Sequence, residues 1–177
     1  MSYPKQRQFM KSDFAESVHQ RSDQAKGVPF PPLQKPLPEG DLVLIDLPDP
    51  DSGVILQTDV HRIFMDRQSW RNFNNEALTL KELSYLLFST QGVLQELGNG
   101  YASRRPVPSA GARHPFETYL ALNRVEGLEP GTYRKIPFSH QLLLLEEIAN
   151  LPQLLTVANL GQRFVGAAAC PYVWRCI

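Results

Sequence analysis

Cysteine is scarce in this sequence, and neither sign of charge is in excess. The 177 residues include two cysteines, and 18 Lys and Arg balance 18 Asp and Glu to a formal net charge of zero. Two cysteines cannot build the disulfide framework of a small secreted domain, and no basic, then apolar leader opens the chain. A neutral chain also lacks a general field that attracts nucleic acid. We therefore expect a cytoplasmic protein that does not bind nucleic acid.

Long hydrophobic runs and the common site motifs are also missing. The longest apolar stretches, such as residues 165–170, fall well short of the ~20 residues that cross a bilayer, so we expect no membrane association. The sequence has no GxxxxGK[ST], HExxH or paired CxxC motif, and Ser109 has no GxSxG context. The histidines have no ligand-like spacing, so we predict no metal site and expect each to be structural or on the surface. They are His19, His61, His114 and His140.

Proline is plentiful at the start of the chain. Eight of the 15 prolines precede Asp51, and repeated proline favours an extended backbone. We predict an N-terminal arm over residues 1–50 and a globular domain over residues 51–177, with the first apolar run of the body at 42–47. Residues 8–24 could form a short polar helix or a disordered tail, and composition leaves both open.

The body has a mixed pattern that predicts an α+β fold. Thr79 and Glu82 have capping-box spacing, and Gly92 follows as a C-cap, so we expect a helix from Leu80 to Gln91. Alternating or apolar runs bounded by turn residues predict strands, and Asn150 before a proline predicts a helix start. The expected strands are 118–122, 132–136 and 141–145, and the second helix is 150–158.

The last residues, 167–177, form another apolar run. We expect a strand of the kind that is buried on both faces, with Cys170 and Cys176 as buried, inert thiols on one of them. An exposed apolar edge there would recruit other chains, so we also expect self-association.

One group of arginines alternates with a serine. Arg67, Ser69 and Arg71 would point the same way in an extended segment, which makes a cationic, hydroxyl-bearing edge. Guanidinium groups bind phosphate oxygens, and one near the pyrimidine end of a flavin can stabilise the negative charge that develops on reduction. Three solvated surface residues are the alternative interpretation.

A second arginine group lies in a segment rich in proline and small residues. Arg105 leads into Pro108, Ser109, Ala110 and Gly111, whose low bulk would let a planar ligand approach the backbone. The alternative interpretation is a simple connection between a helix and a strand.

Taken in order, these segments resemble the nitroreductase family, and in particular its thiazole/oxazole-forming SagB/ThcOx-type dehydrogenase branch. The resemblance covers four stretches: the arginine start at 67–71, the Leu-rich helix ending in Gln-Gly at 79–92, Arg-x-x-Pro-Ser-Ala-Gly-Ala at 105–112 with a proline at 115, and the Gly-Leu-x-Pro-Gly-x-Tyr turn at 127–133. It implies an α+β sandwich that forms a homodimer and holds FMN at the subunit interface.

The resemblance also implies site residues, with no metal and no catalytic side chain assigned. Arg67, Ser69 and Arg71 would contact the phosphate, ribityl chain or pyrimidine edge of FMN. The isoalloxazine would be lined by Pro108, Ser109, Ala110 and Gly111, and Arg105 is a further candidate for cofactor binding.

The implied activity is hydride transfer through FMN. NADH, NADPH or a reduced substrate would be the donor, and a nitro compound, a quinone or a peptide azoline would be the acceptor. Family domains continue past the position of Ile177, so we expect the C-terminal third of the fold to be absent from this sequence. Gln68 and His114 depart from the family pattern, which leaves a second hypothesis: a non-catalytic flavin-binding or partner-binding module.

Overall fold

The computed structural model describes residues 23–176. Contacts divide the chain into two units, residues 1–31 and 32–177, and the predicted boundary after residue 50 falls inside the second unit. In the first unit the described residues include a short 3₁₀ helix, η1 (Gln24–Lys26). The helix or tail considered for residues 8–24 lies almost wholly outside the described residues. No helix in the described part of the chain is both long enough and apolar enough to cross a membrane.

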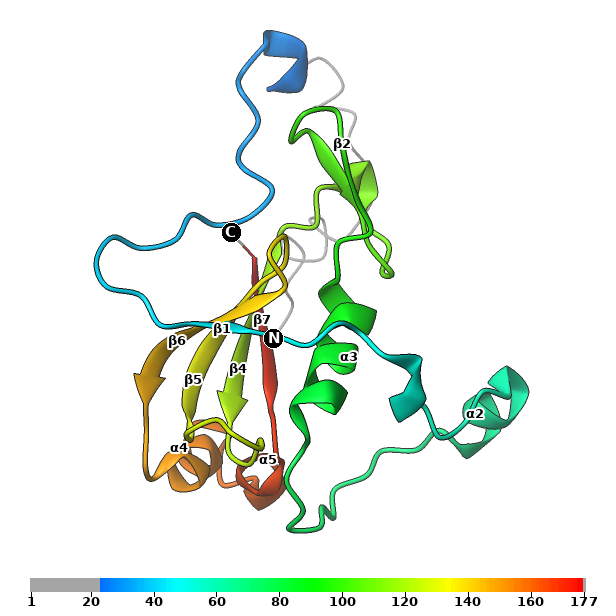
Figure 1. Cartoon of the computed structure of the whole chain (residues 1–177), viewed down its shortest axis with the longest axis vertical. Helices are drawn as coiled ribbons and strands as arrows, with labels where there is room; N and C mark the ends of the chain where they lie inside the picture. Colours follow the sequence, from blue (N-terminus) through cyan, green and yellow to red (C-terminus); the bar gives the residue numbers. More distant parts are fainter. Residues whose placement is uncertain (1–22, 177) are drawn as a thin grey trace, which may run out of the picture. The chain divides into compact units, whose positions relative to one another are not determined.

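The second unit is built on a five-stranded antiparallel sheet, with strand order β1-β6-β5-β4-β7 (Figure 1). The strands β4, β5 and β6 follow one another in the chain, as the turn residues between the predicted strands indicated. The bounds are β1 (Leu44–Asp46), β4 (Phe116–Leu122), β5 (Gly131–Ile136), β6 (Gln141–Glu147) and β7 (Tyr172–Cys176). A separate two-stranded sheet pairs β2 (Gln95–Leu97) with β3 (Ala102–Arg104).

Local signals fix both ends of the first predicted helix. The helix α3 (Leu80–Gln91) has the expected capping box between Thr79 and Glu82, and the amide of Gly92 donates to the Phe88 carbonyl. The helix α4 (Leu151–Ala158) follows Asn150, whose side chain makes no capping bond. The remaining elements are η2 (Ser52–Val54), α2 (Val60–Asp66), η3 (Ala110–Ala112) and α5 (Arg163–Ala167). Helices packed on an antiparallel sheet confirm the α+β prediction.

The core joins α3 to the sheet. Leu83 and Leu87 of α3 are fully buried, as their i, i+4 spacing requires, and they share one apolar cluster with strand residues. Fully burying a leucine contributes about 1.5–3 kcal/mol. The strand members of the cluster are Leu120, Leu122, Tyr133 and Leu142. This packing fixes the C-terminal end of α3 relative to the strands.

A short segment, residues 33–36, lies against the sheet, and we call it the strap. Leu33 is buried, and the amide of Lys35 donates to Oε1 of Glu117 at 2.8 Å. Arg134 donates to the Pro36 carbonyl at 3.1 Å. The proline-rich stretch therefore contacts the sheet here, and it belongs to the same unit as the sheet.

The C-terminal run differs from its prediction in three ways. Ala167 ends α5, and the strand begins only at Tyr172. The strand β7 is an edge strand because it pairs only with β4 in this sheet, and Val173 and Trp174 are about half exposed. Burial raises the pKa of the Cys170 thiol to about 12, as expected of an inert cysteine, but Cys170 lies outside the strand. Cys176 is exposed, so the prediction of a second buried thiol is wrong.

Candidate functional site

A cavity of about 300 Å³ forms where the connection to β4 passes the end of α3. This volume is at the lower end of the range for small-molecule sites. The lining is mostly apolar with a few polar groups, as in ligand sites generally. It consists of Gln91, Val107, Pro108, Ser109, Ala110, His114, Pro115 and Phe116, and we call it the Pro-Ser-Ala pocket.

The pocket wall is a tight turn around η3. Gly111 adopts φ +67°, which glycine tolerates, but Ala112 and His114 also have positive φ, an uncommon conformation for residues with a side chain. Two hydrogen bonds to Ser109 hold the turn: the Ala112 amide donates to the Ser109 carbonyl at 3.0 Å, and the His114 amide donates to Ser109 Oγ at 3.0 Å. Strain of this kind persists where surrounding structure enforces it, and it gathers at functional sites.

His114 is buried and neutral at neutral pH. Burial lowers the pKa of its imidazole, and the charge of Arg105 lowers it further. Nε2 lies 3.2 Å from the carbonyl oxygen of Ser103, and since that oxygen can only accept, Nε2 carries the proton. The expectation of a hydrogen-bonded structural histidine is confirmed for His114.

Arg105 lies behind the pocket wall. Its guanidinium donates to Ser103 Oγ at 3.2 Å, to Gln91 Oε1 at 3.1 Å and to the Leu33 carbonyl at 3.4 Å. It also stacks over the ring of Phe138, with 5.9 Å from Cζ to the ring centroid. Arg105 lines a narrow crevice that borders the pocket through Gln91 and is too small for a water molecule. Its predicted role in cofactor binding stays a prediction.

The first arginine group lies elsewhere in the chain. Arg67, Ser69 and Arg71 follow α2 and are exposed, and the backbone at Arg67 is extended. Cζ of Arg71 lies 5.7 Å from the ring centroid of Phe164 in α5. Within the described residues, no hydrogen bond or ion pair connects this group to the Pro-Ser-Ala pocket. One copy of the chain therefore brings together Pro108, Ser109 and Ala110, with Gly111 in the adjacent turn, but not the two arginine groups.

Three proteins that are similar to this chain carry the same description. A curated protein of Methanocaldococcus jannaschii is 37% identical over 131 residues, which is 73% of this chain and 60% of that protein. A solved structure from Ralstonia eutropha JMP134 is 31% identical, with a TM-score of 0.54 over 82% of this chain and 63% of its own. One from Anabaena variabilis ATCC 29413 is 24% identical, with a TM-score of 0.60 over 76% of this chain and 27% of its own. Each is described as a putative nitroreductase.

The chain has a nitroreductase-like fold. The solved structures show this fold for the chain, and the curated relative is similar to it in sequence over 131 residues. No family model matches the chain. The chain spans about three-fifths of the length of the curated relative that it matches.

The residues of the Pro-Ser-Ala pocket fit a planar heteroaromatic ring such as that of a flavin. Pro108, Ala110, Pro115 and Phe116 provide apolar surface for a planar ring, and no side chain stands on Gly111 to block its backbone. The lining contains no lysine or arginine. A phosphate attached to such a ring would therefore need cationic side chains from another segment.

Sequence reasoning missed two polar residues of the Pro-Ser-Ala pocket, Gln91 and His114. Gln91 was noted only as the last residue of α3, yet it lines the pocket and accepts from Arg105. His114 was considered as a structural or surface histidine and as a departure from the family pattern, not as a residue of the site. Only their positions could have pointed to them, because Gln91 ends the predicted helix and His114 follows the small residues at 108–111.

A second polar cluster joins α3 to the sheet. Ser84 and Lys135 are almost fully buried, and His140 lies between them, 2.7 Å from Ser84 Oγ and 3.0 Å from Lys135 Nζ. Burial lowers the pKa of Lys135 to about 7. Serine, histidine and lysine can form a nucleophilic centre, but the Ser84 hydroxyl is inaccessible and donates to the Pro48 carbonyl. The cluster is structural.

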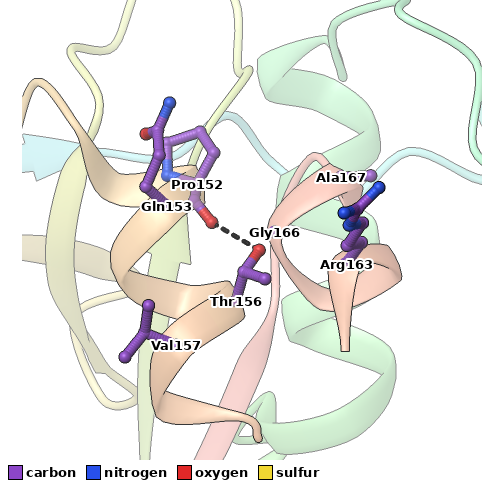
Figure 2. Close-up of a pocket in the computed structure, with 7 residues that line it drawn as sticks. All are labelled: Pro152, Gln153, Thr156, Val157, Arg163, Gly166 and Ala167. Carbon is purple, nitrogen blue, oxygen red and sulfur yellow. Dashed lines mark hydrogen bonds between the residues drawn. The ribbon is translucent and has the colours of Figure 1, made fainter. Parts of the chain in front are cut away.

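A larger groove of about 490 Å³ lies between α4 and α5 (Figure 2). The hydroxyl of Thr156 donates to the Pro152 carbonyl at 2.9 Å, the bond dashed in the figure, so this polar group is already used within α4. The rest of the lining includes Val157, Gly166 and Ala167, and its two other polar residues, Gln153 and Arg163, lie on opposite sides of the groove in Figure 2. Without converging polar groups, this groove is a weaker candidate site than the Pro-Ser-Ala pocket.

Proposed function

We propose that this chain is an FMN-dependent oxidoreductase of the nitroreductase type. The observation that carries the proposal is the Pro-Ser-Ala pocket itself. Pro108, Ser109 and Ala110 were singled out by the sequence pattern, and they line one small cavity at the end of α3. The likeness to nitroreductase-described proteins supports the same assignment.

The pocket residues would hold the flavin ring. Apolar groups exclude water from it, and the turn held by Ser109 and His114 keeps the wall in place before the ligand arrives. When bound, FMN supplies the hydride chemistry, and the protein supplies orientation and charge stabilisation. Neutral His114 adds no positive charge to the pocket. The donor would be NADH, NADPH or a reduced substrate, and the acceptor a nitro compound, a quinone or an azoline-type peptide, the last as in the SagB/ThcOx-type branch.

The phosphate, ribityl chain and pyrimidine edge are assigned to Arg67, Ser69 and Arg71. These residues are exposed and make no contact with the pocket in one copy of the chain as described. A homodimer, in which this group of one copy faces the pocket of the other, would complete the site. The low cysteine content supports a cytoplasmic setting for such a dimer.

The test is a flavin titration of the purified chain. We expect a yellow protein or saturable FMN binding, and weaker binding by about 1–3 kcal/mol for each charged hydrogen-bonding group lost in Arg67→Ala and Arg71→Ala. Arg62→Ala is the matched control, since Arg62 is an exposed arginine on α2 that pairs with Asp66. A colourless protein that fails to bind added FMN contradicts the proposal.

Turnover separates this proposal from the second hypothesis of a non-catalytic module. Bound FMN that NADH or NADPH reduces, with electrons passed on to a nitroaromatic compound or a quinone, supports an enzyme. Bound FMN that neither donor reduces favours the module.

A further inference from the structure

Gln91 occupies the boundary between the Pro-Ser-Ala pocket and the crevice that holds Arg105. It is the last residue of α3, it is 9% exposed as a residue, and it lines both spaces. A buried amide has two donors and an acceptor to satisfy, so each of its terminal atoms needs a partner.

Arg105 decides which way this amide faces. A guanidinium has only donors, so the atom 3.1 Å from Nη1 must be the amide oxygen of Gln91. The amide nitrogen is the other terminal atom of the same planar group and is directed away from Arg105. No residue of the described chain accepts a hydrogen bond from it.

The other polar groups of the pocket are already used. Ser109 Oγ accepts from the His114 amide, and His114 Nε2 donates to the Ser103 carbonyl. The remaining lining is apolar: Val107, Pro108, Ala110, Pro115 and Phe116. The Gln91 NH₂ group is thus a fixed donor beside an apolar slot, which suits a planar heteroaromatic ring with an acceptor on its edge.

We propose that the Gln91 amide donates a hydrogen bond to an acceptor atom of the flavin ring, and that Arg105 is the positioning residue that orients it. This inference rests on the proposed function and adds a ligand contact and its support. Arg105 then acts on the cofactor through Gln91 rather than by touching it.

The test compares FMN binding by the wild-type chain with that of Gln91→Leu and Gln91→Glu. Losing one neutral hydrogen bond predicts about threefold to tenfold weaker binding for Gln91→Leu. Gln91→Glu keeps the bond to Arg105 but presents an anionic acceptor to the ring. We expect weaker binding and a more negative reduction potential of bound FMN than in Gln91→Leu. Gln95→Leu, an exposed glutamine in β2, is the control and leaves both unchanged.

The role of Arg105 is tested by coupling. Arg105→Gln alone weakens FMN binding, but in the Gln91→Leu background it causes no further loss, because the amide it orients is gone. Since Arg105 also holds the strap at Leu33, melting curves check folding, and Arg105→Lys is the milder replacement if Arg105→Gln unfolds. Additive losses in the double variant overturn the positioning role.

The outcomes separate this inference from the proposed function. If the wild-type chain binds no FMN, the proposed function fails. If it binds FMN and both Gln91 variants match it in affinity and potential, the proposed function stands and the inference about Gln91 is wrong.

Discussion

Ser84 Oγ in α3 lies 2.7 Å from Nε2 of His140, which immediately precedes β6. The single hydroxyl proton of Ser84 goes to the Pro48 carbonyl, so His140 Nε2 must be the donor to Oγ. His140 Nδ1 is then an acceptor, and it lies 3.0 Å from Lys135 Nζ. Burial lowers the pKa of His140, and the neighbouring Lys135 lowers it further, which keeps the imidazole neutral. Four residues thus form one directed chain between α3 and the sheet.

Ser84→Ala should destabilise the fold by about 1–3 kcal/mol, because it leaves a buried imidazole donor and the Pro48 carbonyl without their partner. Urea denaturation measures the free energy of unfolding. Ser89→Ala is the matched control on α3, since the Ser89 hydroxyl only bonds back to the Tyr85 carbonyl in its own helix. Equal effects of the two variants would show that the chain through His140 contributes no net stability.

Because of Lys135, the free energy of unfolding should depend on pH between about 7 and 10.5. Its pKa falls from 10.5 in the ordinary state to about 7 in the fold, so between these values the unfolded chain binds more protons than the folded one. The free energy of unfolding contributed by this group therefore rises with pH from about 7 to 10.5, and below 7 its penalty is constant. The pKa of Lys135 is lowered because burial disfavours the charged form of its amine.

Lys135→Met removes that penalty. We expect its free energy of unfolding to exceed that of the wild type most at pH 7 and below, and the gap to shrink as pH rises toward 10. Urea denaturation at pH 6.5, 8 and 9.5 measures the gap, with Lys81→Met, an exposed lysine on α3, as the control. A gap that is independent of pH contradicts the lowered pKa.

Much of this fold could be predicted from the sequence because its signals are local. The capping residues of α3 and the turn glycines before β5 act within a few positions of themselves, and the structure has both elements. The contacts that build the polar clusters are not local: Ser84 and His140 are 56 positions apart, and Arg105 and Gln91 are 14 apart. Periodicity carries no information about which distant side chains meet.

The prediction that the C-terminal strand is buried was wrong for a different reason. An apolar composition predicts a strand, but it does not say whether the strand lies at the centre of a sheet or at its edge, and Val173 and Trp174 lie at an edge. In the site, the small residues at 108–111 could be found from sequence because low bulk is itself a signal. Gln91 could not, since its role depends on a guanidinium brought in by the next connection.

Gly166→Ala should push α4 and α5 apart. A Cβ at Gly166 would collide with the Pro152 carbonyl and the Thr156 hydroxyl, both on the α4 side of the groove in Figure 2. We expect a loss of about 1–3 kcal/mol from overpacking, measured as a lower melting temperature. In Gly53→Ala the new methyl group would meet only the Asp51 carboxylate of an exposed residue, so this control should melt close to the wild type.

Val173→Lys should reduce self-association of the chain. Val173 is 53% exposed on β7, and a charged residue on an edge strand opposes pairing with another edge. Size-exclusion chromatography with light scattering compares it with the wild type and with Val157→Lys, an exposed valine on α4 away from the edge. A wild-type chain that is a monodisperse, cooperatively melting monomer contradicts the prediction.

The strap has a consequence for the order of events during folding. Its bonds reach residues 72 to 104 positions further along the chain: Leu33 to Arg105, Lys35 to Glu117, Pro36 to Arg134 and Gln34 to Phe138. Closing loops of that length costs entropy that no short-range contact repays, so such contacts form only once the strands that receive them exist. The strap is therefore synthesised before the residues that hold it but takes its place after them, so Glu117, Arg134 and the Arg105 guanidinium stay solvated until it docks.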